Sequence, residues 1–119
     1  MAVIGAVPCG AMDDRVLPFS ASFTEEPDGT PVLTTVGDLD AATSPELVSS
    51  VEALRPLRGL TIDTSKLSFV DSAGLRALLT VREMVDADAS APTRLRHVND
   101  ELRRLLEICG LADAFDEVA

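Results

Sequence analysis

The stretch that decides the fold is Ser68-Phe-Val-Asp-Ser-Ala-Gly-Leu-Arg-Ala-Leu-Leu79, where a short apolar β-type segment runs directly into a helical pattern. A helix beginning near Ser72 leaves its first N–H groups without internal partners, so its start tolerates negative charge. Gly74 has no Cβ and would let another chain or a phosphate approach the backbone closely. The stretch therefore predicts a rigid turn that exposes the Ser72 hydroxyl. Spacing alone favours the simpler interpretation that Asp71 or Ser72 only caps the helix.

The sequence upstream of this stretch predicts a hairpin. Phe19–Thr24 alternates bulky and small residues, as a half-buried strand does. The Asp28-Gly29 pair within 26–30 supplies a tight turn. Val32–Val36 is apolar and β-branched enough for the returning strand, which we expect to end in a short acidic loop at Gly37–Asp40.

A helix and a further strand are expected between the hairpin and the central stretch. Thr43 with Glu46 three residues later predicts a capping box, and helical spacing continues to Arg55. Leu60–Ile62 predicts a compact strand that ends at Asp63.

The sequence downstream adds a polar break over Asp86–Pro92, a short strand over 95–98 that includes His97, and a third helix capped by Asn99. Gly110 stands where a helix end needs a residue with positive φ. The apolar face of this helix is expected to be Leu102, Leu105, Leu106 and Ile108. A hairpin followed by alternating strands and helices predicts the α/β class, with a small mixed β-sheet of four to five strands and helices packed mainly on one face.

Composition bounds the function classes. The chain has 119 residues, 46% of them hydrophobic, and a formal net charge of −10, which fits one domain with an apolar core. Such acidity with 3% aromatic residues argues against nucleic acid and anionic membranes as partners. Residues 1–18 lack periodicity and are expected to be a flexible N-terminal extension to a domain at 19–119. Cys9 and Cys109 form no C-x-x-C pair, and without a basic start the N-terminal segment does not resemble a secretion signal, so we expect a cytoplasmic protein.

The segment Phe69-Val-Asp-Ser-Ala-Gly-Leu75 resembles the signature of the anti-sigma factor antagonists, the bacterial members of the STAS domain family. The resemblance extends over about Phe19 to Val118 and implies a single STAS-like domain. Other stretches that resemble the family, in order and spacing, are Gly37-Asp-Leu-Asp40, Ser44-Pro-Glu-Leu47, Leu60-Thr-Ile-Asp-Thr-Ser65, Leu95-Arg-His-Val98 and Leu105-Leu-Glu-Ile-Cys-Gly-Leu111.

This resemblance implies a switch in which Ser72 is phosphorylated. The unphosphorylated form would bind an anti-sigma factor that is itself a serine-protein kinase and thereby release the sigma factor, and a phosphatase would reset the phosphoserine. The resemblance implies no cofactor, and we expect a monomer or weak dimer. The implied partner-binding residues are Asp38, Leu39, Asp40, Asp71, Ser72, Gly74 and Leu75.

Other functions compete with this one. A STAS scaffold or ligand-sensing module would keep the fold and leave Ser72 as a mere cap. A small serine hydrolase would use Ser72, Asp86 or Asp88, and His97, in the chain order of the α/β-hydrolases. Against the hydrolase, Val70 stands where its nucleophile turn needs Gly, and the chain is short for that fold.

Two acidic groups invite a metal interpretation. The Asp86–Ser90 stretch begins like a calcium loop but departs from that pattern at Ala91 and His97, so we expect a solvated loop. Asp38, Asp40 and Asp71 could gather a cation, although a solvated acidic rim is the more ordinary arrangement. No metal is expected.

Overall fold

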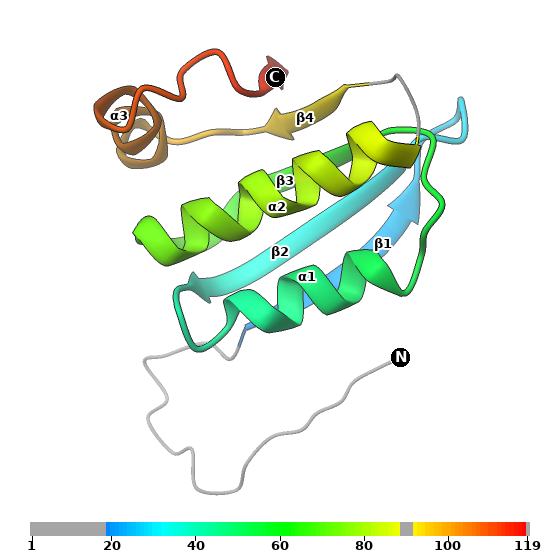
Figure 1. Cartoon of the computed structure of the whole chain (residues 1–119), viewed down its shortest axis with the longest axis horizontal. Coiled ribbons are helices and arrows are strands. Elements are labelled where there is room, and N and C mark those ends of the chain that lie inside the picture. Colours follow the sequence, from blue (N-terminus) through cyan, green and yellow to red (C-terminus); the bar gives the residue numbers. More distant parts are fainter. Residues whose placement is uncertain (1–18, 89–91, 119) are drawn as a thin grey trace, which may run out of the picture.

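Strands and helices alternate after an initial hairpin in the computed structural model, which describes residues 19–88 and 92–118 (Figure 1). The expected α/β class is confirmed, with five strands in the described residues. The predicted extension at 1–18 lies outside them. In chain order the elements are β1 (Ser20–Glu25), β2 (Pro31–Leu39), α1 (Ser44–Glu52), β3 (Leu60–Val70), α2 (Ser72–Asp88), β4 (Thr93–Arg96), α3 (Asp100–Ile108) and β5 (Asp116–Val118).

The sheet is mixed, with strand order β1-β2-β3-β4-β5. β1 and β2 pair antiparallel, and the other neighbours pair parallel. The predicted hairpin turn is confirmed: the N–H of Gly29 donates to Glu26 O at 2.8 Å, and Gly29 has a φ of +89°, which glycine adopts without strain. The parallel strands bring the carboxyl ends of β2 and β3 to the same edge of the sheet.

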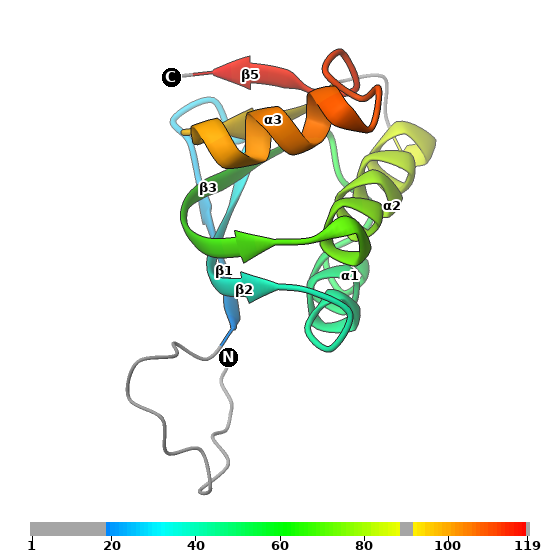
Figure 2. The ribbon, with the colours of Figure 1, turned by 90° about the vertical axis from the view of Figure 1, so that its left-hand side faces the viewer.

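Helices α1 and α2 cover one face of the sheet, as expected (Figure 2). Helix α3 runs in a different direction from α1 and α2. Figure 1 shows α3 nearly end-on and the other two helices from the side. Burying each Leu or Val fully in the core between sheet and helices contributes about 1.5–3 kcal/mol. The core includes Leu33, Leu39, Leu47, Val51, Leu60, Ile62, Leu78, Val81, Val85, Leu95 and Leu106. In the described part of the chain, no helix is long and apolar enough to cross a membrane.

Two strands are longer than the sequence pattern predicted. β2 continues through Leu39, so the loop expected at Gly37–Asp40 is wrong, and β3 continues to Val70 instead of ending at Asp63. Polar residues do not end these strands, because each strand supplies the other with backbone partners up to the pair Leu39 and Val70. Gly37, with a φ of +98°, sits at an irregularity in this pairing.

Three further boundaries differ from the expectation. α1 ends at Glu52 rather than Arg55. α2 continues through Asp88, where a polar break was expected from Asp86. β4 ends at Arg96, so His97 and Val98 lie outside it, and His97 has a φ of +59°.

The predicted start and end of α3 are confirmed. Asn99 Oδ1 accepts a hydrogen bond from the Leu102 N–H at 2.8 Å, and Gly110 has a φ of +74°. The expected apolar face is wrong at one position, since the Ile108 side chain is exposed. β5 was not anticipated as a strand, because its short sequence carries two acidic residues and shows no alternation.

Candidate functional site

Two segments that stood out in the sequence, Gly37–Asp40 and Ser68–Leu79, meet at the carboxyl ends of β2 and β3. Asp38 lies opposite Phe69 in the parallel pairing. The N–H of Asp71 then donates to Leu39 O at 3.3 Å, just before α2 begins. Sequence positions about thirty residues apart are thus joined by backbone hydrogen bonds, and the sheet holds them in place.

Gly74 sets how closely α2 approaches β2. A Cβ at this position would lie 2.2 Å from the backbone oxygen of Leu39, a distance that real Cβ atoms essentially never show. The close approach that the glycine allows is therefore made by the chain's own β2, where the sequence had suggested another chain or a phosphate. Gly74 itself is buried and fixes the first turn of α2 against the end of the strand.

Asp71 caps α2, and Ser72 does not. Asp71 Oδ1 accepts a hydrogen bond from the Gly74 N–H at 2.9 Å, and its backbone oxygen accepts from the Leu75 N–H at 2.9 Å. Ser72 is exposed, and among the described residues its hydroxyl makes no hydrogen bond. The capping alternative raised by the sequence is thus resolved in favour of Asp71, which leaves the Ser72 hydroxyl available at the surface.

The turn between β2 and α1 is tied to the start of α2. Asp40 Oδ1 accepts hydrogen bonds from the backbone N–H groups of Ala42 and Thr43. The predicted capping box is wrong, because the Thr43 hydroxyl donates to Asp38 O at 2.7 Å instead of capping α1. Ser44 Oγ lies 2.6 Å from Asp40 O and 3.2 Å from Ala73 O.

Thr43 and Ser44 were not identified as site residues from the sequence. The signal that could have found them is their spacing after Asp40, since an Asx turn followed by a hydroxyl residue is a local capping pattern.

The seven predicted site residues divide by exposure. Leu39, Gly74 and Leu75 are buried, so they support the exposed residues of the site from within the core. Asp38, Asp40 and Asp71 are half-buried, and Ser72 is exposed. Two of the three carboxylates, those of Asp40 and Asp71, are occupied with backbone N–H groups. The site thus combines one free hydroxyl with an acidic rim on a rigid base.

An apolar groove of about 470 Å³ opens between the end of β3 and α3. Phe69 lines it and is 53% exposed, although it stands in the apolar β-type segment whose pattern favours a buried strand end. β3 is mostly buried where β4 pairs with it, from Leu60 to Asp63, and most of its residues after Thr64 are exposed because β4 ends earlier than β3.

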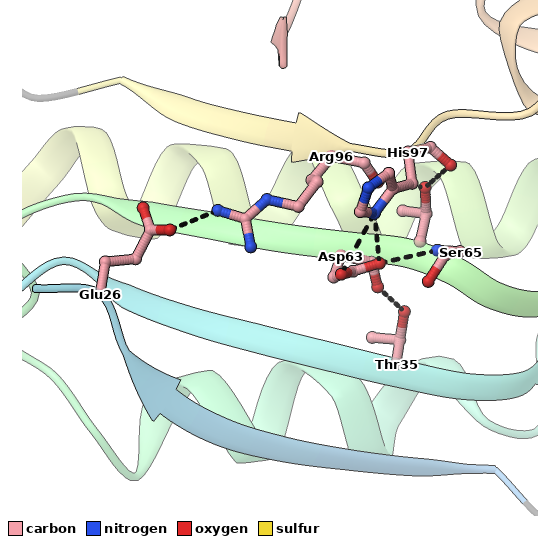
Figure 3. A network of polar contacts seen from close by, with 7 residues as sticks. Glu26, Thr35, Asp63, Ser65, Arg96 and His97 are labelled. Atoms are coloured by element: carbon pink, nitrogen blue, oxygen red, sulfur yellow. Dashed lines mark hydrogen bonds and ion pairs between the residues drawn. The ribbon is translucent and has the colours of Figure 1, made fainter. Parts of the chain in front are cut away.

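The residues proposed for a hydrolase do not assemble. His97 Nδ1 contacts the carboxylate of Asp63 at 3.4 Å on β3, as Figure 3 shows. Asp86 stands on the last turns of the helix that Ser72 begins, about 20 Å away along the helix axis at 1.5 Å per residue. Asp88 pairs with Arg55.

The carboxylate of Asp63 contacts Ser65 and His97 and so has a structural role. Burial raises the pKa of its carboxyl, but hydrogen bonds from Ser65 and the contact with His97 outweigh this and leave the pKa below its ordinary value. Nearby, Arg96 forms an ion pair with Glu26 across the sheet face (Figure 3). Within 19–88 and 92–118, no group of three or more His, Cys, Asp or Glu residues could hold a metal ion.

Comparison with known proteins gives a family match for the sequence and similar folds among solved structures. The sequence profile of the STAS domain matches residues 23–119. No curated protein matches the sequence. Among solved structures, an anti-sigma factor antagonist from Mycobacterium paratuberculosis is similar, with a TM-score of 0.73 and 24% identity over 84% of this chain and 85% of that one.

The anti-sigma factor antagonist SpoIIAA is similar in two states. Its unphosphorylated form gives a TM-score of 0.68 and 19% identity over 84% of this chain and 89% of that one. The phosphorylated form of the Bacillus protein gives a TM-score of 0.64 and 18% identity over 84% of this chain and 92% of that one. SpoIIAA therefore has this fold with and without its phosphate.

Proposed function

The chain belongs to the STAS domain family, and we propose that it is an anti-sigma factor antagonist whose affinity for its partner is switched by phosphorylation of Ser72. The unphosphorylated form binds an anti-sigma factor with serine kinase activity and so releases the sigma factor. Phosphorylation by the same partner ends the binding, and a phosphatase restores the starting state.

The observation that carries this proposal is the division of roles at the start of α2. Asp71 makes the capping hydrogen bond, so the adjacent hydroxyl of Ser72 has no structural duty among the described residues. Ser72 is exposed on the first turn of a 17-residue helix whose position is fixed by Gly74 against Leu39. A kinase meets a phosphoacceptor that is accessible and held in place.

The switch acts on the interface and leaves the fold intact. A phosphate adds about −1.5 to −2 charges, next to Asp71 and on a chain that already carries a formal net charge of −10. The positive end of the α2 dipole offsets part of the repulsion, by about 0.3–1 kcal/mol at an exposed site. A partner surface packed against the hydroxyl has no such compensation. The likeness to SpoIIAA in both its forms supports an unchanged fold.

Phosphate transfer and binding, measured with purified proteins, test the proposal. The chain is incubated with each kinase-type anti-sigma factor of the source bacterium and ATP, and phosphate incorporation is located by mass spectrometry. We expect one of them to phosphorylate the wild type and the Ser49→Ala variant, which alters another exposed serine on α1. The same factor leaves Ser72→Ala unmodified.

Binding supplies the second arm of this test. Ser72→Asp lowers affinity for that anti-sigma factor, while Ser49→Asp does not. A chain that binds none of these factors, or binds one equally well with Ser72→Asp, is a scaffold or ligand-sensing STAS module.

A further inference from the structure

The groove beside the candidate site is lined by two of the exposed large hydrophobic side chains of the described residues. One wall is the end of β3, from Leu67 to Val70, and the other is α3, including Leu105 and Ile108. Phe69 is 53% exposed and Ile108 is 73% exposed. In the described part of the chain only one other large hydrophobic side chain is exposed, Leu54 at 43%, and it lies beside the β1–β2 hairpin. Contiguous exposed apolar surface of this kind marks interaction sites.

The groove exists because β3 is longer than its neighbour. β4 pairs with β3 only from Leu60 to Asp63, while β2 pairs with β3 as far as Val70. Beyond Thr64, the edge of β3 away from β2 therefore faces α3 and has no strand partner among the described residues. Helix α3 crosses this end of the sheet (Figure 2). An unpaired edge beside apolar side chains is a surface that another polypeptide can cover.

The groove and the phosphoacceptor are parts of one surface. Val70 ends β3 in the groove, and only Asp71 separates it from Ser72. A partner that contacts Ser72 is therefore close to the end of the groove at Val70. The α3 wall carries Asp100 and Glu101 in its first turn and Arg104 one turn later. These two carboxylates, with the acidic rim at Asp71, favour basic side chains on the occupant.

We propose that the groove is the docking site for an apolar segment, flanked by basic side chains, of the same anti-sigma factor that acts on Ser72. This inference rests on the proposed function. The groove supplies affinity that does not depend on the hydroxyl, and Ser72 supplies the switch. Docking then raises the concentration of the kinase at Ser72 without contributing to the chemistry of phosphate transfer.

The test separates docking from chemistry with a matched pair of variants. Ile108→Gln and Leu54→Gln each replace one exposed aliphatic side chain close to a helix end, one in the groove and one distant from it. The probe is the purified anti-sigma factor that phosphorylates wild-type Ser72. We expect Ile108→Gln to weaken binding and raise KM about tenfold, as loss of an interface anchor does, with kcat unchanged. Leu54→Gln leaves both constants at the wild-type values.

The possible results distinguish the docking site in the groove from the phosphorylation switch at Ser72. Equal binding and equal KM for the two variants, with Ser72 still phosphorylated, would overturn the docking site and leave the switch intact. Loss of kcat with unchanged KM would assign Ile108 to the transfer step and contradict docking. Phe69→Ser is a second variant for the same measurements of binding and KM, since this exposed side chain lines the same groove. If no kinase-type anti-sigma factor binds the wild type, the proposed function fails and the docking site fails with it.

Discussion

Gly74 is the residue on which the geometry of the site depends most. Its position above Leu39 O leaves no room for a side chain, and the clashing atom belongs to backbone that is held in a parallel ladder. The end of β2 cannot move aside without breaking its pairing with β3. The glycine therefore couples the acidic turn after β2 to the helix that presents Ser72.

Gly74→Ala is expected to destabilise the protein by about 1–3 kcal/mol, the range for forcing an extra carbon into a packed site. Urea unfolding followed by circular dichroism measures this change. Ser72→Ala, two residues earlier in the same helix, is the control, and it should stay within about 0.5 kcal/mol of wild type because an exposed, unbonded hydroxyl is removed. Equal stability of Gly74→Ala and wild type would show that α2 can move away from β2.

Asp71 is expected to contribute stability through its cap. Asp71→Ala should cost about 0.5–2 kcal/mol, the usual loss for an N-cap residue, whereas Asp71→Asn should retain most of the stability since its amide oxygen can accept the same Gly74 N–H. Thermal unfolding of the two variants at neutral pH compares them. A loss in Asp71→Asn as large as that in Asp71→Ala would contradict the capping role.

At the scale of elements, the two helices on the sheet are joined at their carboxyl ends by one carboxylate. Asp88 Oδ1 and Oδ2 accept hydrogen bonds from the Arg55 guanidinium at 2.9 and 3.0 Å, and Oδ2 also accepts from the Leu57 N–H at 3.0 Å. Hydrogen bonding to Arg55 lowers the pKa of Asp88, partly opposed by burial. The contact fixes the segment that leads from α1 into β3.

This carboxylate predicts a pH-dependent difference in stability. A pKa that is lower in the folded state means that the ionised form stabilises the fold above the unfolded value of about 3.9. Asp88→Asn should thus unfold at lower urea concentration than wild type at pH 7, and the difference should shrink as the pH falls below about 4. Asp86→Asn, whose partner Arg82 is 3.9 Å away, is the matched control and should differ little. A pH-independent gap would rule out the ion pair as its source.

Element types followed from local pattern, and element lengths did not. Asn99 and Gly110 marked the limits of α3 because caps are local chemistry. Asp63 suggested a strand end, yet β3 continues for seven residues because β2 pairs with it. Ile108 fits the helical apolar period. Whether another element covers its side chain depends on where β4 ends, and no local sequence pattern gives that length. The groove was therefore not predictable from the sequence.

At the scale of the whole molecule, the net charge and the exposed apolar side chains are consistent with the proposal of a protein partner. The net charge of −10 disfavours nucleic acid, and two exposed apolar side chains, Phe69 and Ile108, line the groove at the end of β3. The resemblance to the STAS family implied that Asp38, Asp40 and Asp71 lie near Ser72. The sequence pattern offered Asp71 as a cap of α2, which the structure confirms, but it did not predict that Asp40 accepts hydrogen bonds from the backbone of the turn before α1.

Phosphorylation should leave the molecule folded. The far-ultraviolet circular dichroism spectrum of the Ser72-phosphorylated protein is expected to match that of the unmodified protein, and the midpoint of thermal unfolding should shift little, because the helix dipole offsets part of the added repulsion. A large loss of helical signal would mean that the switch is conformational.

In the proposed switch, one phosphate on Ser72 separates two binding states of an otherwise unchanged protein. Isothermal titration of the cognate kinase-type anti-sigma factor into the unphosphorylated and the Ser72-phosphorylated chain tests it most directly. We expect tight one-to-one binding to the unphosphorylated chain and at least about a hundredfold weaker binding after phosphorylation, equivalent to about 2.7 kcal/mol. Equal affinity for the two forms would contradict it.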